Sequence, residues 1–488
     1  MLKPTLMAAA VAAALLAPGA ASAVSDAEIK ELREQVRQLK EQYEKRIEAL
    51  EERLRQTEGA AQKAQGAAVK AEGVAATAVD AASKAEAQAI KAESAAIQAN
   101  VRPTSEAAFN PAVSVILNGA YANLSQDPGR FQITGFVPTL GEVSPGNRGF
   151  SLGESELALT ANVDHHFRGT LIAALAPDDS IGVEEGYIQT LGLSNGFTLK
   201  AGRFLSSVGY QNEIHAHAWD FTDAPLANKV FLGGRLADDG LQIKWVAPTD
   251  IYFELGAEAG RGLSFPGSNR DKNGAGANNL FARLGGDIGA STAWRVGLSH
   301  LSTNAQNRNY DDLDSTGTQV NNSFNGRSRL WALDGILKWA PQGNATYNNF
   351  KLQGEYFRRA ENGNFTYDTA AASLGTQTDA LNSVQSGWYA QGVYQFMPRW
   401  RVGYRYDRLN AGTVKLGLVD SGALSAADFP ILARNDATRN TLMVDFSPSE
   451  FSRLRLQYAS DKSLLGATDN QVFLQYIMSL GAHGAHRF

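Results

Sequence analysis

Residues 388–407, WYAQGVYQFMPRWRVGYRYD, decide the fold. On both sides of the turn at Met397-Pro398, every second residue is apolar or aromatic, and the residues between are mostly polar, charged or small. A period of two is typical of a β-strand that has one apolar and one water-facing side. The stretch therefore predicts a hairpin of two half-buried strands.

The same alternation recurs along the chain after Pro111 and predicts sixteen strands. Strands of about 9–11 residues are long enough to cross a bilayer at a tilt. The predicted strands are 112–122, 150–163, 166–176, 182–193, 196–206, 239–247, 250–260, 278–288, 291–303, 327–339, 348–360, 386–397, 399–410, 436–447, 450–461 and 469–482.

The connections between these strands are mostly long and short in turn. Long ones include 123–148, 205–238, 303–326, 361–386 and 411–435, whereas 164–165, 194–195 and 397–398 are tight. This alternation with an even strand count is typical of an outer-membrane barrel with short periplasmic turns. Aromatic residues near strand ends suit the two membrane interfaces: Trp331, Trp339, Trp388, Trp400, Phe446 and Phe451. We expect an all-β transmembrane barrel of about 16 antiparallel strands with a water-filled lumen.

The composition of the 488 residues excludes several classes of protein. With no cysteine there is no disulfide scaffold, thiolate metal site or cysteine nucleophile. A formal charge of −5 gives no reason to expect nucleic-acid binding. No run of 18 apolar residues occurs, which excludes a helical membrane protein. No G-x-S-x-G or comparable arrangement is present, so we expect no enzyme.

The N-terminus has the pattern of an export signal. Lys3 precedes an alanine-rich apolar stretch, and Ala21-Ser22-Ala23 gives a small-x-small cleavage site. We expect a signal peptide at 1–23 and an exported mature chain.

Residues 24–99 are predicted to form a periplasmic helical segment. Apolar residues at coiled-coil spacing are Ile29, Leu32, Val36, Leu39, Tyr43, Ile47, Leu50 and Leu54. Five heptads at 63–97 then place alanine at their second and sixth positions. We favour oligomerisation through these seams over a single solvated helix, because an isolated apolar stripe would stay in water. A linker is expected at 100–111, between the helix and a barrel at 112–488.

Together these features resemble trimeric outer-membrane porins of the phosphate-selective porin-like group, including those with a periplasmic coiled-coil extension. The resemblance implies a passive diffusion channel whose third extracellular loop, here 205–238, folds into the lumen. It also implies a homotrimer in outer-membrane lipid, with Phe488 as a signal to the barrel-assembly machinery. Phosphate selectivity does not carry over, because this loop is acidic and contains histidines rather than a ladder of cations.

The charged residues of the loop and of strands 13 to 15 are the candidate pore constriction. These are Glu213, Asp220, Asp223, Arg401, Arg405, Arg439, Arg453 and Arg455. A basic wall opposite an acidic loop would create a transverse field that favours small polar or zwitterionic solutes. Alternatively, the arginines pair locally with Asp407 and Asp445.

His215 and His217 flank one residue and would project to the same side of an extended segment. With Glu213, Asp220 and Asp223 they could bind Zn²⁺ or another divalent metal, and no other cofactor is expected. The alternative is that both histidines attach the loop to the wall by hydrogen bonds.

The sequence predicts a porin for passive diffusion of small polar solutes or ions. It would lie in the outer membrane of a Gram-negative bacterium, with its N-terminal helix in the periplasm. Two alternatives remain open: a divalent metal (zinc) uptake protein that uses the histidine and acidic loop, and a structural barrel anchor with a periplasmic coiled coil.

Overall fold

The computed structural model describes residues 111–481 except 140, 142, 177–179 and 269–270, together with scattered helical positions between 30 and 63. The chain divides into two units, residues 1–108 and 109–488. The predicted signal peptide, the seam residues of the helical segment, His483, His486 and Phe488 lie outside the described residues.

The described positions of the first unit are helical and exposed. Arg37 donates to Glu34 at 2.6 Å, one helical turn away, and Lys40 lies 3.8 Å from Glu44. Such pairs give modest support to a solvent-exposed helical face. The helix expected there is therefore present at these positions, whereas the coiled-coil seams stay a prediction.

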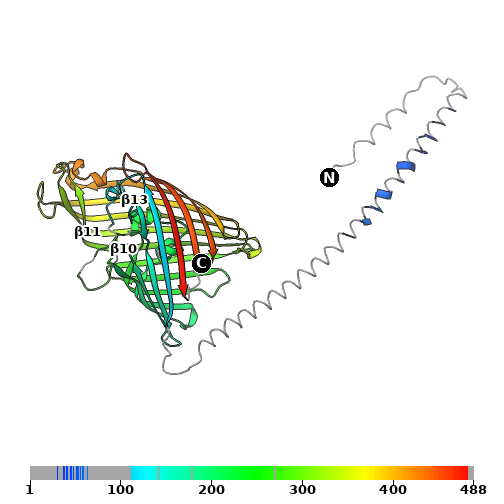
Figure 1. Cartoon of the computed structure of the whole chain (residues 1–488), viewed down its shortest axis with the longest axis horizontal. Coiled ribbons are helices and arrows are strands. Elements are labelled where there is room, and N and C mark those ends of the chain that lie inside the picture. The colour runs from blue at the N-terminus through cyan, green and yellow to red at the C-terminus, as the bar shows by residue number, and fades with distance from the viewer. Residues whose placement is uncertain are drawn as a thin grey trace, which may run out of the picture. The chain divides into compact units, whose positions relative to one another are not determined.

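The second unit is a closed antiparallel barrel (Figure 1). Its strands are β1 (Ala112–Leu124), β2 (Gly149–Leu152), β3 (Ser155–Asn162), β4 (Phe167–Leu175), β5 (Ile181–Thr190), β6 (Phe197–Leu205), β7 (Ala237–Val246), β8 (Tyr252–Gly260), β9 (Ala277–Ile288), β10 (Thr292–Leu313), β11 (Gln319–Trp339), β12 (Asn349–Tyr367), β13 (Gln377–Met397), β14 (Trp400–Leu416), β15 (Thr438–Ser449), β16 (Ser452–Asp461) and β17 (Asp469–Gly481).

Short helices occur in the connections. They are α2 (Leu226–Leu232), α3 (Gly417–Asp420) and the 3-10 turns η1 (Pro128–Arg130), η2 (Ser194–Gly196), η3 (Gln211–Glu213), η4 (Ala216–Ala218), η5 (Pro341–Gly343), η6 (Ala426–Asp428) and η7 (Pro430–Leu432). Among the residues that the structure describes, no helix is both long and apolar enough to span a bilayer.

Pairing of β1 with β17 on one side and with β2 and β3 on the other closes the barrel. Because β2 and β3 pair with β1 in nearly continuous register, with Gly119 opposite Leu152 and Ile116 opposite Glu156, they form one interrupted strand position. The barrel thus has sixteen strand positions, which confirms the predicted number and order.

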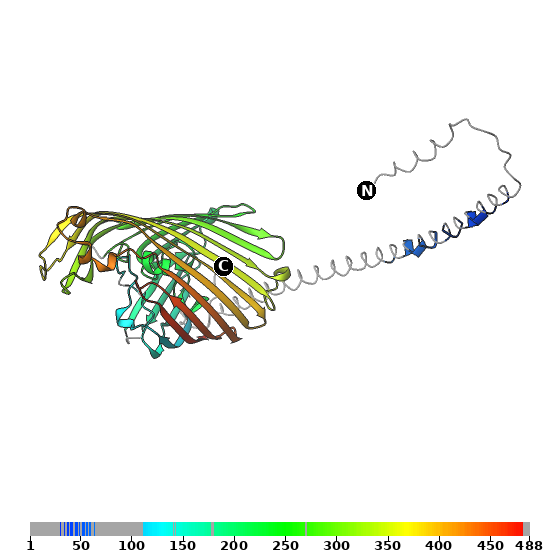
Figure 2. The same cartoon turned by 90° about the horizontal axis from the view of Figure 1, so that it is seen from above.

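The expected lengths of three extracellular loops were wrong. Much of 303–326, 361–386 and 411–435 is strand, because β10 to β14 continue for 17–22 residues, well beyond the length needed to cross a bilayer. β3 to β8 have only 8–10 residues. One side of the barrel is therefore much taller than the other, as Figure 2 shows for the long yellow and green strands.

The two faces of the wall differ as the alternation predicts. On β11, Trp331 and Leu333 are about half exposed on the outside. The residues that alternate with them, Leu330, Ala332 and Asp334, are buried on the inside. Outward residues of this kind are exposed and present an apolar band to lipid.

The connection between β6 and β7, residues 206–236, folds into the barrel; we call it the inner loop. Its helix α2 lies inside the ring of strands (Figures 1 and 2). Val208, Leu226 and Phe231 of the inner loop are buried against wall residues such as Phe357 and Leu409. This packing positions the charged side chains described next.

Candidate functional site: the inner loop and the barrel wall

The two ends of the inner loop are joined by Asn212. Its amide nitrogen donates to the carbonyl oxygens of Ser206 at 2.8 Å and of Leu236 at 2.9 Å, and its amide oxygen accepts from the backbone nitrogen of Leu236 at 2.6 Å. The side chain is fully buried. It therefore fixes the base of the loop, a role that the sequence reasoning missed because a single Asn in a polar stretch gives no signal.

Polar side chains of the wall supply partners to the backbone of the inner loop. The backbone nitrogen of Leu226 donates to Asp407 at 2.9 Å, and that of Thr222 donates to Gln457 at 2.9 Å. Arg455 donates to the carbonyl oxygen of Trp219 at 2.7 Å. Since buried backbone groups need hydrogen bonds, this irregular segment depends on the charged inner face of the barrel.

Two acids of the inner loop form ion pairs with the predicted basic wall. Asp223 lies 2.9 Å from Nη2 of Arg405 and also contacts Arg439 and Lys229. Asp220 lies 3.2 Å from Nη1 of Arg401 and also contacts Lys351. Burial would raise the pKa of Asp223, but the three cations outweigh it and hold this pKa well below its usual range.

Glu213 contacts a different part of the wall. Its carboxylate lies 2.7 Å from Nη2 of Arg283 on β9 and accepts from the Ser207 hydroxyl. Burial opposes ionisation, but Arg283 and Lys244 dominate and lower the pKa of Glu213 to about 2. The eight predicted residues therefore do not form one ring. Glu213 lies with Arg283, whereas three of the five predicted arginines contact Asp220 or Asp223 and the other two, Arg453 and Arg455, donate to the carbonyl oxygen of Trp219.

The expected transverse field between a basic wall and an acidic loop is wrong in its geometry. That field needs water between the two charged surfaces, whereas here the loop rests on the wall and the charges touch. Arg405, Arg439 and Arg455 are at most 1% exposed, so they cannot face a solute. The alternative of local pairing is also observed, since Arg401 lies 2.9 Å from Asp445 and Arg405 lies 3.0 Å from Asp407.

A recess opens at the end of the barrel that carries the tight turns. Its volume is about 490 Å³, and it is lined by Lys338, Lys351 and Arg401 together with residues of the turns after β9 and β11. Lys351 and Arg401 both contact Asp220. The recess therefore meets the inner loop at a group of mixed charge.

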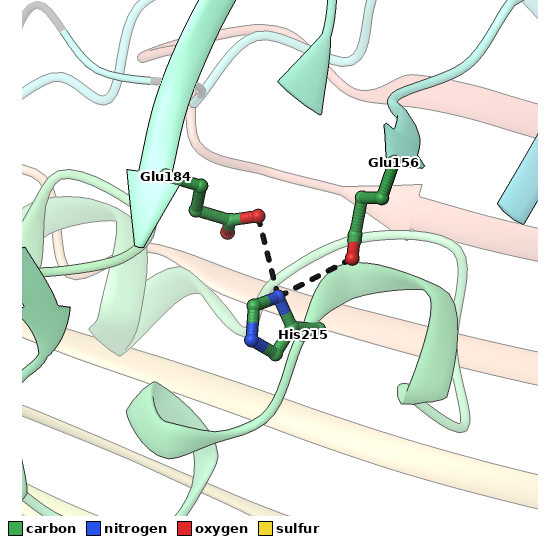
Figure 3. Close-up of side chains that lie close together, drawn as sticks. All are labelled: Glu156, Glu184 and His215. Carbon is green, nitrogen blue, oxygen red and sulfur yellow. Dashed lines mark hydrogen bonds and ion pairs between the residues drawn. The ribbon is translucent and has the colours of Figure 1, made fainter. Parts of the chain in front are cut away.

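The two histidines of the inner loop meet glutamates of the short-strand side. His215 Nδ1 lies 3.2 Å from Glu184 and 3.4 Å from Glu156, as Figure 3 shows. Its Nε2 lies 3.0 Å from Glu185, and His217 Nδ1 lies 2.9 Å from Glu156. We call these five residues the His–Glu cluster. Its contacts agree with the alternative that the histidines attach the loop to the wall.

Burial would lower the pKa of His215, yet this pKa lies well above its usual value. Hydrogen bonds to Glu156, Glu184 and Glu185 outweigh the cost of burial, because each carboxylate favours the imidazolium form.

The oxygen donors expected beside the histidines were wrong. Glu213, Asp220 and Asp223 are occupied by cations elsewhere, and the neighbouring carboxylates belong to β3 and β5 instead. Glu184 and Glu185 are adjacent in the sequence, yet both side chains reach His215. The reason is a shift of register between β4 and β5, where Ile172 lies opposite Glu185 and Ala173 lies opposite Val183. A bulge turns an additional side chain inward, and strict alternation could not reveal it.

Formal charges in this region leave an excess of acid. Arg235 pairs with Glu154 and Glu184, and the buried Lys200 acts electrostatically on Glu185. Against the carboxylates of Glu154, Glu156, Glu184 and Glu185, these two cations leave two negative charges when both imidazoles are neutral. Donor atoms of Glu156, Glu184 and His215 lie within 4.8 Å of one another. Two imidazole protons or one divalent cation would balance the region.

A search of curated proteins finds a relative in Aquifex aeolicus that is described as an uncharacterized protein. It is 31% identical over 415 residues, which cover 80% of this chain and 82% of the relative. No protein-family model matches the chain.

Among solved structures, a loop-deletion mutant of OmpT from Vibrio cholerae matches with a TM-score of 0.47 and 11% identity, over 76% of this chain and 99% of that one. The channel DcaP of Acinetobacter baumannii matches with 0.43 and 11%, over 77% and 99%. An anion-selective porin from Comamonas acidovorans matches with 0.44 and 11%, over 76% and 99%. These scores are too low to transfer a solute, a selectivity or an assembly to this chain.

Proposed function

The chain belongs to the family of the Aquifex aeolicus protein, and we propose that it is an outer-membrane channel for passive diffusion of small polar solutes. One observation carries this proposal: a closed sixteen-position barrel has an apolar outer band and a charged inner face that holds the inner loop. A closed barrel satisfies every strand hydrogen bond in lipid, and a polar interior suits an aqueous path.

The outer band has the height of a bilayer core. Trp331 and Trp339 face outward on β11 and are separated by eight residues, or about 26 Å along the strand. The outward residues between them are Leu333, Gly335 and Leu337. At the strand tilt of about 35–45° in such barrels, this separation corresponds to about 20 Å along the membrane normal, which is close to the apolar band of about 25 Å between two aromatic girdles.

The charges near the inner loop favour small polar solutes over ions of one sign. The recess is lined by Lys338, Lys351, Arg401 and Asp287, and two of its cations, Lys351 and Arg401, contact Asp220 of the inner loop. A lining with both signs gives a weak preference between anions and cations.

Single-channel recording of the purified chain in planar bilayers tests this function. We expect stepwise conductance and, in a tenfold KCl gradient, a reversal potential close to zero. A chain that inserts but gives no steps would contradict the channel, and a strongly anion-selective or cation-selective current would contradict the proposed solute class.

We also propose that three chains assemble through the short-strand side. Among the large apolar side chains described on the short-strand side, three are the most exposed: Phe150 at 88%, Ile181 at 72% and Leu241 at 64%. Large apolar side chains so exposed near the end of a wall are suited to a second subunit. We expect Phe150→Ser/Ile181→Ser to yield monomers in mild detergent, whereas Leu298→Ser/Leu352→Ser on the tall side retains trimers. Trimers that persist in the first variant would contradict this interface.

A divalent cation at the His–Glu cluster is a second candidate function. The donor set of imidazole nitrogens and carboxylates suits Zn²⁺, and the ion would replace the imidazole protons, because two negative charges remain when both imidazoles are neutral. A bound ion there would join the inner loop to β3 and β5.

Calorimetric titration with ZnCl₂ tests this second candidate. Because His165 and His166 lie exposed in a turn and His483 and His486 are close in sequence, all four are first replaced by Ala. In that background we expect one Zn²⁺ per chain, lost in His215→Ala/Glu184→Gln and kept in His300→Ala. Absence of binding in the background itself would contradict the site, without bearing on the channel.

A further inference from the structure

A cluster of cations lies on the outer surface of the tall side of the barrel. It consists of Arg327 and Arg329 on β11, Arg358 on β12 and Lys415 on β14, and we call it the outer basic cluster. All four side chains are exposed. Ser328, between the first two, is buried on the inner face, so the strand alternation places both arginines outside.

Strand register places Arg327, Arg329 and Lys415 in two neighbouring rows across β11 to β14, and Arg358 in the adjoining row opposite Trp331. In the first row Arg329 pairs with Ala360, Ala360 with Val384 and Val384 with Thr413. The next row runs from Arg327 through Asn362 and Asn382 to Lys415. Because the middle of these rows holds short side chains, a groove of about 550 Å³ lies between the arginines and the lysine.

The charges of this groove are not neutralised by the chain. In the described part of the structure, no carboxylate forms an ion pair with any of the four cations. Arg327 makes a long contact of 3.5 Å with the amide oxygen of Asn304. Glu361 also borders the groove, but its side chain is buried toward the inner face and its carboxylate lies 2.7 Å from Arg308. Three of these cations, Arg327, Arg329 and Lys415, line the groove, and such a group of exposed charges of one sign favours an anionic partner from outside the chain.

The depth of the groove identifies the chemistry of that partner. Arg329 is two residues, or about 7 Å, beyond Trp331, on the side away from the tight turns. The ring of Trp331 lies 4.5 Å from that of His300 and is tilted against it by 56°; Trp331 marks one edge of the apolar band and Trp339 marks the other. The outer basic cluster therefore lies at the level of lipid headgroups in the outward-facing leaflet.

We propose that this groove binds the phosphorylated headgroup of a glycolipid in the outer leaflet. The proposal rests on the outer-membrane location in the proposed function. Arginine guanidinium groups form paired hydrogen bonds with phosphate oxygens, and Asn362, Asn382 and Thr413 offer polar groups for sugar hydroxyls. The acyl chains would lie against the outward residues below, such as Leu333 and Tyr356.

The test compares lipid A that carries two phosphates with the same lipid after dephosphorylation. Each lipid is titrated into the full chain in detergent, and the bound lipid is counted by native mass spectrometry. The variant is Arg327→Ser/Arg329→Ser/Lys415→Ser. Its matched control, Arg130→Ser/Arg434→Ser/Lys462→Ser, removes three exposed cations from connections at the same end of the barrel. Heat-modifiable gel mobility and single-channel conductance verify that both variants fold.

We expect diphosphorylated lipid A to bind the wild type at least tenfold more tightly than the dephosphorylated lipid. The triple variant should lose this preference, and the control should keep it. Equal binding of the two lipids, or equal losses in both variants, would overturn the proposal. Displacement of the lipid by millimolar inorganic phosphate would also overturn it, since the groove would then be a simple anion site. Channel steps without lipid binding would refute this inference alone, whereas binding without steps would refute the channel alone.

Discussion

Asp223 of the inner loop lies 2.9 Å from Nη2 of Arg405, a residue 182 positions away on the barrel wall. The same carboxylate contacts Arg439 and Lys229, so three cations converge on one acid. Arg405 and Arg439 are almost completely buried. Asp223 therefore holds the middle of the inner loop against β14 and β15.

Replacement of Asp223 by Asn should detach this part of the loop. It leaves three buried cations with one acceptor fewer, and loss of one partner of a buried ion pair costs about 3–5 kcal/mol. We expect frequent flickering and a higher mean conductance in single-channel records, and faster proteolysis within 206–236. Asp250→Asn, at an exposed turn between β7 and β8, should change neither. Wild-type records from Asp223→Asn would show that the loop is held elsewhere.

Two fully buried asparagines of the inner loop should respond in opposite ways to the same substitution. Asn212 makes three hydrogen bonds, whereas no partner is found for the side-chain atoms of Asn228 among the described residues. At about 1 kcal/mol for each hydrogen bond, Asn212→Leu should destabilise the folded chain by about 3 kcal/mol. Asn228→Leu should be neutral or stabilising. Denaturant unfolding in detergent measures both, and equal destabilisation would contradict the role assigned to Asn212.

The barrel could be predicted because its signal is distributed over many residues. Alternation such as that of Trp400–Tyr406 is repeated in every strand, and the tight turns fix the order of the strands. One error of the prediction concerned strand length: the alternation of β10 continues to Leu313, but its polar outward residues read as a loop.

The contacts of the inner loop could not be predicted, because they join residues far apart in the sequence. Nothing in the sequence near His215 indicates that Glu156 or Glu184 will contact it. The bulge that turns both Glu184 and Glu185 toward His215 is a property of strand pairing. The sequence predicted Asp223 opposite the basic wall that contains Arg405, but as two charged surfaces across a pore and not as an ion pair. It assigned His215 the wrong carboxylates, because proximity in the chain was the only guide.

Acid should release the Glu213 end of the inner loop. Arg283, Lys244 and Arg295 lower the pKa of Glu213 in the folded protein to about 2, against the burial that would raise it. A depressed pKa stabilises the folded contact above the ordinary carboxyl value of about 4.5, and this stabilisation disappears as the pH falls toward 2. The contribution at pH 7 is about 1–3 kcal/mol.

Single-channel records at stepped pH measure this effect. We expect constant conductance from pH 7 to pH 5 and a progressive change below about pH 4.5. Glu213→Gln should show the altered conductance at pH 7 already and respond less to acid. A wild-type transition between pH 6 and pH 7 would show that another group controls the loop and would contradict the assignment to Glu213.

A charge on the outer band should separate a membrane barrel from a barrel in water. Leu333 is 54% exposed, and on β11 it lies between Trp331 and Trp339, within the band assigned to lipid. An arginine on the lipid-facing side of a transmembrane barrel costs about 2–4 kcal/mol at the midplane and about 0–1 kcal/mol near an interface, because its charge must leave water; at Leu333, midway between the two, the cost is about 1–2 kcal/mol. Leu465, which is 52% exposed in the connection between β16 and β17, has no lipid to face. We expect Leu333→Arg to lower the free energy of unfolding in phospholipid vesicles by this amount and Leu465→Arg to change it by less than about 0.5 kcal/mol. Only lipid distinguishes these two equally exposed leucines, because both substitutions would be neutral in a barrel surrounded by water. Equal and small effects would therefore contradict the membrane assignment.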